Sequence, residues 1–530
     1  MRGYWVPRFV VPIVFGLAVS GLVAATQPPK PAPSRDFDVV VYGGTAGGVI
    51  AAVSAAREGL STALVSPNAH LGGMVSGGLG WTDYGKKEVI GGYSLEFFER
   101  VGRKYGRPIE WHFEPHVAEA VFEDLAKEAR ISVFRHERLA EGSGVRRDGS
   151  RLSSIVTESG ARYGARVFVD ASYEGDLMAQ AHVTYTWGRE GAAEYGESLA
   201  GVRDRTPFHQ FRVPVSPLDA QGHLLPEIMP RSPDAVGAGD RRVQAYNFRL
   251  CMTKEPANRV AWPKPAAYDP ARYELLARYL PPLEADSRRP LTIDDVMKAD
   301  IVQRGKSDTN NNGAFSTDYI GGSYGYPNGS YAERARIRQA HVDYVQGFLY
   351  FLATDARVPR SLSAEMNQWG LCADEFVDAD HWPYQLYVRE ARRMIGEYVM
   401  SQKDIQTELT KPDAIGMGSY NSDSHNVQRR PTDGTAVENE GDMQVPVTPY
   451  QIPYRVMLPR RAEATNLLVP VCFSATHVAY STLRMEPQYM IIGQAAGVAA
   501  KLAIDGGVAV QEIDANALRR KLVSQRVVFE

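Results

Sequence analysis

Polar residues near the end of the sequence have side chains suited to acid–base chemistry on a small molecule. His477, within the segment SATHVAY at residues 474–480, can take a proton from a hydroxyl group. Arg484 can hold an anionic or hydroxylated group, and His425 ends the polar segment 420–425. These three residues form the predicted catalytic set.

Each of these residues also has a purely structural interpretation, and the sequence leaves both open. His477 can bond nearby backbone, and Arg484 can form an ion pair with Glu486. Asp423 and His425 can form a hydrogen-bonded turn instead of facing a substrate.

Other catalytic chemistries lack their sequence signatures. There is no GxSxG elbow, and Ser474, although close to His477, has no evident partner acid. The histidines include no HExxH pattern, so no metal site is expected. Cys251, Cys372 and Cys472 lie far apart in no metal-like spacing, and we interpret all three as ordinary buried thiols.

A glycine loop near residue 43 predicts the cofactor that such chemistry needs. Residues 37–42 are a short β-branched run, residues 49–59 read as a small-residue helix, and residues 61–66 as a second strand. In such a βαβ unit the loop amides and the positive end of the helix face a pyrophosphate. The pattern therefore predicts dinucleotide binding, with Gly43 making the tight turn and Gly48 allowing close packing.

Two positions depart from the usual dinucleotide pattern. Thr45 occupies the middle position of GxGxxG, which is normally glycine. The second strand ends at Ser66 rather than at the acid that usually binds the ribose hydroxyls. An uncharged strand end also tolerates a 2′-phosphate, so NADP stays open as an alternative.

The segment after the second strand favours FAD over NAD. Many glycines between residues 70 and 80 suggest backbone lying against a flat ligand. Together with residues 168–176 and a glycine- and alanine-rich helix at 490–504, this segment looks like part of a glutathione-reductase-type FAD domain.

Several longer motifs make the resemblance specific. The chain carries GGT at residues 43–45, HLGGM at 70–74, DASYEGDLMA at 170–179, GRE at 188–190 and RMEP at 484–487. It resembles the broad bacterial family of FAD-dependent oxidoreductases over almost everything after residue 36. The resemblance implies an FAD domain built from both ends of the chain, with the middle covering the flavin and shaping the substrate pocket.

The resemblance also implies cofactor contacts. The pyrophosphate is expected near the glycine loop and the flavin near the HLGGM segment. At the end of the second strand, Ser66 or Asn68 is the candidate for a weaker contact with the ribose. Gly493 and Gln494 are expected to begin a helix whose amides stabilise negative charge on the reduced flavin. The predicted cofactor residues are Gly43, Gly44, Thr45, Ala46, Gly48, Ser66, Gly72, Gly73, Met74, Asp170, Ala171, Gly493 and Gln494.

The chain divides into a leader, a linker and an α/β body. Arg2 and Arg8 precede an uncharged run that ends in small residues, which is typical of a secretory signal peptide; an uncleaved membrane anchor is the alternative. We interpret Arg389, Arg392 and Arg393 as the solvated face of a helix. The predicted divisions are a signal at 1–25, a proline-rich linker at 26–35, a Rossmann-like FAD domain at 36–200 and 441–530, and an inserted mixed α+β cap at 201–440.

Charge and composition narrow the function. A net charge of -3 from 59 basic and 62 acidic residues offers no basic face for nucleic acid, which is not an expected partner. The leading hypothesis is an exported, periplasmic or extracellular FAD enzyme that takes a hydride from a small hydroxylated molecule such as a carbohydrate. The alternatives are a flavin-dependent lyase or isomerase without net redox change, and a non-catalytic binding protein.

Overall fold

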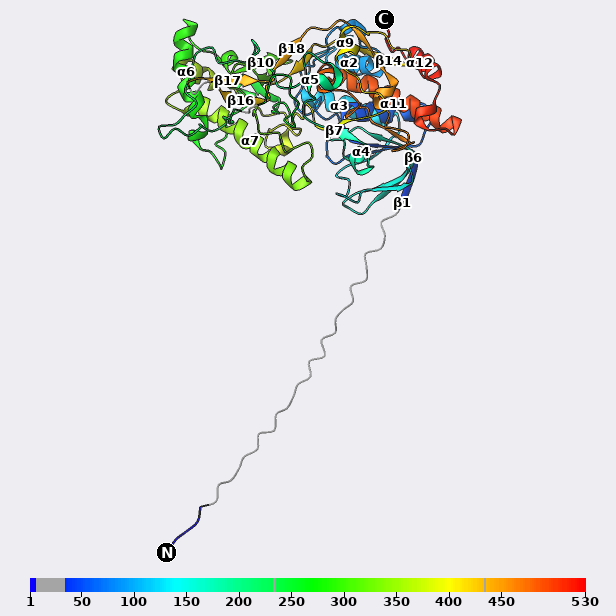
Figure 1. Ribbon diagram of the computed structural model, residues 1–530, viewed down its shortest axis with the longest axis horizontal. Helices are drawn as coiled ribbons and strands as arrows, with labels where there is room; N and C mark the ends of the chain where they lie inside the picture. Colours follow the sequence, from blue (N-terminus) through cyan, green and yellow to red (C-terminus); the bar gives the residue numbers. More distant parts are fainter. Residues whose placement is uncertain (6–33, 232–233, 433–434) are drawn as a thin grey trace.

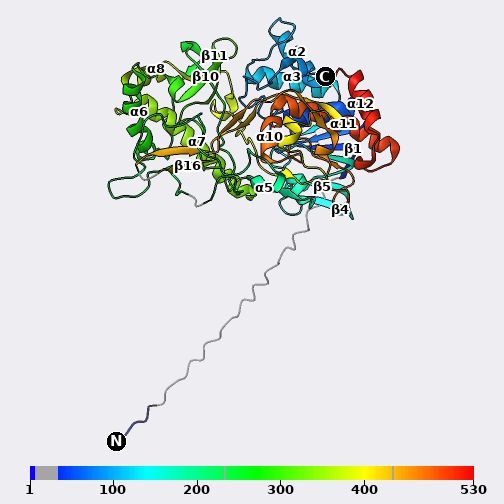
Figure 2. The same ribbon diagram turned by 45° about the horizontal axis from the view of Figure 1, so that its top comes forward.

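The computed structural model describes residues 1–5, 34–231, 234–432 and 435–530. The predicted signal and linker lie largely outside these residues. Figures 1 and 2 show two lobes side by side, one formed by both ends of the chain and the other by its middle. Within the described ranges, no helix combines the length and apolar character needed to cross a bilayer.

A seven-stranded sheet forms the core of the first lobe. Its order is β3-β2-β1-β6-β5-β4, and β20 from the C-terminal part pairs with β6 as well. The predicted βαβ unit is confirmed as β1, α1 and β2, with β1 and β2 parallel. The strands are β1 (Ser34–Tyr42), β2 (Thr62–Val65), β3 (Ser132–Phe134), β4 (Val145–Asp148), β5 (Arg151–Val156), β6 (Arg162–Asp170) and β20 (Leu467–Leu468).

Two buried helices from opposite ends of the chain pack tightly on this sheet. They are α1 (Ala46–Arg57) and α11 (Glu486–Gly506). A Cβ atom on Gly493 would lie 2.2 Å from the Gly47 carbonyl oxygen, and one on Gly497 would lie 2.5 Å from Ser54 Cβ. Small residues on both helices therefore let their backbones touch.

The helix α11 begins earlier than predicted. Its first residue is Glu486, with Pro487 in the first turn, so a start at Gly493 is wrong. Proline is well accommodated there because the first helical amides have no partner inside the helix. Other helices of this lobe are α2 (Gly92–Lys104), α3 (Pro115–Glu128), α4 (Asp176–Gln180), α5 (Ala192–Tyr195), α9 (Gln402–Gln406), α10 (His477–Leu483) and α12 (Ala515–Ser524).

The second lobe combines an antiparallel sheet with helices. The sheet order is β10-β11-β8-β12-β9. Its elements are β8 (Leu250–Thr253), β9 (Arg259–Val260), β10 (Met297–Ile301), β11 (Lys306–Asn311), β12 (Gly370–Cys372), α6 (Glu274–Ser287), α7 (Tyr331–Thr354) and α8 (Arg360–Met366).

Four short two-stranded pairings occur elsewhere in the described residues. They join β7 (Tyr185–Thr186) to β13 (Arg393–Met394), β14 (Ala414–Gly418) to β19 (Tyr450–Pro453), β15 (Ser422–Ser424) to β18 (Met443–Val445) and β16 (Gln428–Pro431) to β17 (Val437–Glu440).

The prediction that all three cysteines are free thiols is wrong. Cys251 and Cys372 form a disulfide, with their Cα atoms 5.6 Å apart, and Cys472 is free and buried. The antiparallel pairing of β8 with β12 brings the two cysteines together across a separation of 121 residues. Spacing along the sequence gives no hint of such a pairing.

Packing between α1 and α11 predicts a site-specific stability loss. Gly493→Ala should lower the free energy of unfolding by about 1–3 kcal/mol, because the added methyl group drives the helices apart. Gly506→Ala, at the end of the same helix with only Val508 side-chain atoms nearby, is the control and should be neutral or mildly stabilising. Equal melting temperatures for the two variants would contradict this packing.

The disulfide predicts the number of reactive thiols. Denatured but unreduced protein should be alkylated once, at Cys472, and reduction should raise this to three. Intact-mass spectrometry after alkylation counts the modified sites. Three alkylations without prior reduction would disprove the bond.

Candidate functional site

The glycine loop joins the end of β1 to the start of α1. Gly43 has a φ of 108°, and a Cβ there would lie 2.7 Å from the Ala171 backbone. Thr45 caps α1: its Oγ1 accepts a hydrogen bond from Gly48 N (3.0 Å) and donates one to Ala171 O (2.8 Å). Threonine thus ties the helix start to the end of β6, while the amides of Ala46 and Gly47, which precede the capped Gly48 amide, can face an anion.

A cavity of about 250 Å³ opens over this loop. Gly43, Gly44, Thr45 and Gly73 line it, so the structure brings these predicted cofactor residues together. Ser66 does not line it: a Cβ on Gly44 would lie 2.7 Å from Ser66 Oγ, which sits behind the loop. At the end of β2 the lining residues are Pro67 and Asn68, so Asn68 is the polar side chain placed to meet a ribose.

This cradle fits the pyrophosphate of a dinucleotide. A Cβ on Gly48 would lie 2.0 Å from the Gly43 carbonyl oxygen, so no larger residue keeps the loop and helix this close. Ala46 lies with Gly48 in the first turn of α1. An uncharged loop with open amides at a helix N-terminus suits a doubly charged phosphate bridge.

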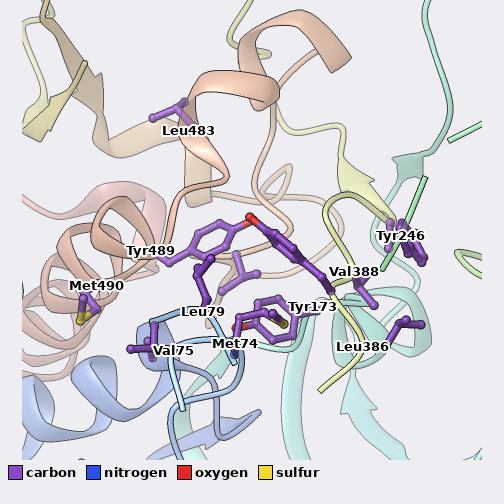
Figure 3. Close-up of a cluster of buried hydrophobic side chains, with 14 of the residues drawn as sticks. Met74, Val75, Leu79, Tyr173, Tyr246, Leu386, Val388, Leu483, Tyr489 and Met490 are labelled. Atoms are coloured by element: carbon purple, nitrogen blue, oxygen red, sulfur yellow. The ribbon is translucent and has the colours of Figure 1, made fainter. Parts of the chain in front are cut away.

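The HLGGM segment packs against residues from both ends of the chain. Met74 N donates to Tyr173 Oη (2.9 Å), and Tyr173 Oη donates to Glu486 Oε1 (2.6 Å). A Cβ on Gly73 would lie 2.4 Å from Tyr173 Oη, and one on Gly72 would meet the Phe122 ring. Figure 3 shows Met74 and Tyr173 side by side at the centre of this cluster.

The remaining predicted cofactor residues lie behind the cavity surface. Asp170 is buried, and its carboxylate accepts hydrogen bonds from the backbone amides of Ser172 (3.1 Å) and Met178 (2.7 Å). Burial raises the pKa of Asp170 to about 6. Ala171 contributes its carbonyl to Thr45, as described above. Their cofactor contacts stay predictions.

Gly493 and Gln494 lie inside α11, not at its start. Gln494 Oε1 accepts from Tyr93 N (2.7 Å), and its Nε2 donates to Gln525 Oε1 (2.8 Å). At the positive end of α11, Pro487 has no amide hydrogen and the Gln488 amide donates to Met485 O (3.0 Å). The packing of α11 against α1 accounts for Gly493, and the hydrogen bonds just named account for Gln494.

The prediction that Arg389, Arg392 and Arg393 lie on the solvated face of a helix is wrong. Residues 384–393 contain no helix, and the three arginines are buried. Arg392 forms an ion pair with Asp176 (2.7 Å). An arginine-rich segment can be buried when carboxylates from distant parts of the chain pair with it. In this protein such carboxylates pair with all three arginines.

His477 lies in the middle of a buried ion-pair network. Its Nδ1 lies 2.8 Å from Glu390 Oε2, and its backbone amide donates to Glu190 Oε2 (2.9 Å). Arg393 forms ion pairs with both Glu190 and Glu390. Burial, followed by the nearby Arg393 charge, lowers the pKa of His477 to about 3, so the imidazole is neutral. With Nδ1–H donated to Glu390, Nε2 carries the free lone pair.

His425 and Arg484 meet through Asp423. Arg484 forms an ion pair with Asp423 (2.7 Å), whose Oδ2 lies 3.7 Å from His425 Nε2, and His425 Nδ1 lies 2.7 Å from Asp318 Oδ2. Burial and Arg389 lower the pKa of His425 to about 4. The alternative ion pair of Arg484 with Glu486 is not formed.

Gln244 joins the two halves of the predicted catalytic set. Its Nε2 donates to Glu390 Oε2 (3.0 Å), and its Oε1 accepts from His425 N (3.0 Å). The network reaches the wall of the cofactor cavity only along the chain, because Tyr387 Oη accepts from Arg484 (3.2 Å) and the adjacent residue Leu386 lines the cavity. Figure 3 shows Leu386 near the Tyr173 cluster.

Sequence reasoning missed Glu390 and Gln244. Neither residue belongs to a motif. The one available indication was Glu390, an acidic residue inside an arginine-rich segment. Other buried polar atoms on or beside the network have no hydrogen-bond partner in the described part of the chain. They are His209 Nδ1, Arg389 Nε, Ser422 Oγ, Asn426 Nδ2 and Asp442 Oδ2.

A separate acidic cluster has ligands suitable for a metal, but a lysine occupies its centre. Glu114, His116 and Glu375 have their ligand atoms within 4.8 Å of one another. The Lys306 ammonium lies 2.7 Å from Glu114 Oε1 and 2.8 Å from Glu375 Oε1. This cation already pairs with both carboxylates of the cluster.

Glu486 predicts a pH-dependent stability difference. Burial raises its pKa to about 8 from an ordinary 4.5, so the folded protein keeps it protonated at neutral pH. The contribution of Glu486 to stability is complete below the pKa of this carboxyl in the unfolded chain and is lost as the pH rises through its pKa in the folded protein. The free energy of unfolding falls by at most about 1.4 kcal/mol per pH unit. Between about pH 5 and 8, Glu486→Gln should therefore lose less stability than the wild type.

Thermal unfolding at several pH values measures this difference. Glu88→Gln, at an exposed carboxylate, is the control and should follow the wild type. If the melting curves of Glu486→Gln and wild type shift in parallel over this range, Glu486 does not carry the proton.

Solved structures resemble only part of this chain. The chain shows limited similarity to OxyS anhydrotetracycline hydroxylase from Streptomyces rimosus, with 12% identity, a TM-score of 0.24 and coverage of 33% of this chain and 41% of that one. L-proline dehydrogenase from P. horikoshii gives 14% identity, a TM-score of 0.24 and coverage of 30% and 59%. Each match spans less than two thirds of the solved chain. A search of curated proteins finds no match.

The family comparison is far more extensive. The model of the family described as FAD dependent oxidoreductase matches residues 38–522, which is most of the chain. The protein therefore belongs to the FAD dependent oxidoreductase family, and FAD is its cofactor.

Proposed function

We propose that this enzyme oxidises a small hydroxylated molecule, with a carbohydrate or glycoside as the first candidate. The observation that carries the proposal is the contact between neutral His477 and Glu390, in a buried network that also holds Arg484 and reaches the cofactor cavity. When bound, FAD supplies the acceptor for the hydride. The chain must then supply a proton acceptor, a binding surface and exclusion of water.

His477 is the proton acceptor in this proposal. Its Nε2 takes the proton of the substrate hydroxyl while the hydride leaves the carbon that bears it, which gives a carbonyl product. Glu390 holds Nδ1–H, so it fixes the tautomer and stabilises the imidazolium that forms. The low pKa of His477 keeps its imidazole unprotonated over the whole physiological pH range.

The binding surface contains both donors and acceptors. Arg484 and Asn426 offer N–H groups, while Asp423 and Asp442 offer carboxylate oxygens. Burial raises the pKa of Asp442 to about 7. A hydroxyl group both donates and accepts, so a molecule with several hydroxyls can satisfy such a mixed set, including the unpartnered atoms around the network.

Export to the periplasm or the extracellular space is part of the proposal. The basic and apolar N-terminal pattern supports it, and so does the Cys251–Cys372 disulfide, because such bonds persist in oxidising compartments. Neither feature depends on the substrate.

Anaerobic reduction tests the reaction. FAD-loaded enzyme should be bleached by at least one member of a panel of sugars and glycosides, and should stay bleached until an electron acceptor is added. Turnover without any acceptor would favour the lyase or isomerase alternative. A panel without effect would overturn the substrate class.

Substitutions at His477 and at the two glutamates that pair with Arg393 test the role of His477. The assay uses the sugar or glycoside that bleaches the wild-type flavin. His477→Gln should slow bleaching by about 10²- to 10⁴-fold. Glu390→Gln should also slow it strongly, because an amide does not hold the same tautomer. Glu190→Gln is the matched control: it also removes a carboxylate from Arg393 but leaves the imidazole contact intact. Equal effects of the two glutamate substitutions would contradict the assignment.

A further inference from the structure

Arg338 on α7 lines the cofactor cavity without a carboxylate partner among the described residues. Its Nη2 donates a long hydrogen bond, 3.4 Å, to the Tyr384 carbonyl oxygen. Its guanidinium carbon lies 5.6 Å from the centre of the Phe248 ring. The side chain is half-buried, and burial lowers its pKa. A guanidinium removed from water in this way is stabilised once an anion joins it.

The other two arginines that line the cavity are already paired. Arg334, one turn earlier on α7, contacts both carboxylate oxygens of Asp176, at 2.9 and 2.8 Å. Arg138 forms an ion pair with Glu158 (2.7 Å). Arg338 therefore has an uncompensated charge, while its neighbours in the cavity wall do not.

The glycine loop lines the same cavity as Arg338. Gly43, Gly44 and Thr45 line it, and the N-terminus of α1 favours negative charge there. The pyrophosphate of FAD carries two negative charges, and a guanidinium binds phosphate oxygens in bidentate geometry. An anion on the loop thus meets a cation from the other lobe.

We infer that Arg338 binds the pyrophosphate of FAD, so that α7 of the inserted lobe completes the cofactor site. This inference goes beyond the proposed function, because it holds for any substrate. It also means that the cofactor itself links the two lobes.

Flavin binding by the full-length protein tests the inference. Protein freed of FAD is titrated with FAD or with riboflavin, which has the flavin ring but no phosphate, and the quenching of flavin fluorescence is followed. Arg338→Gln should weaken FAD binding by about 10- to 100-fold. It should leave riboflavin binding unchanged, which also shows that the variant is folded.

Two further variants complete the experiment. Arg338→Lys should recover part of the lost FAD affinity, because it restores the charge without the bidentate geometry. Arg336→Gln, at an exposed position on the same helix, is the control and should bind both flavins like the wild type. The inference is overturned if Arg338→Gln binds FAD normally, or if it weakens FAD and riboflavin binding equally.

Discussion

Burial of arginine side chains between the two lobes is the constraint on which the rest of this structure depends. Arg392 and Arg393 are almost completely removed from water. An unpaired charge in such a place costs about 3–5 kcal/mol, so each arginine needs a carboxylate. Those carboxylates come from distant segments, Asp176 after β6 and Glu190 beyond it, so the segment 384–393 is held where the lobes meet.

The same ion pairs shape the chemistry. Glu390 both neutralises Arg393 and holds the ring of His477. Stability and reactivity therefore share one carboxylate, and a change that weakens the interface also changes the tautomer of the proposed base. The apolar stretch of this segment adds Leu386 to the cofactor cavity, so one short piece of chain serves the cavity, the network and the interface.

Local patterns predicted the parts of the fold that local interactions determine. The β-branched run, the glycine loop and the small-residue helix appear as β1, the turn at Gly43 and α1, because each is specified by neighbouring residues. His425, Arg484 and His477 lie in one polar network, and their catalytic roles stay predictions. What the sequence could not show is pairing between distant segments, such as the disulfide or the contact of Glu390 with His477. The buried arginines were misread because composition alone makes such a run look solvated.

The pairing of α1 with α11 has a consequence for biosynthesis. During translation the glycine loop and its helix leave the ribosome long before residues 486–506 exist. Until then the apolar surface of α1 has no helix to cover it, and β6 lacks β20. The N-terminal βαβ unit therefore completes its packing only once the C-terminal part of the chain has been made.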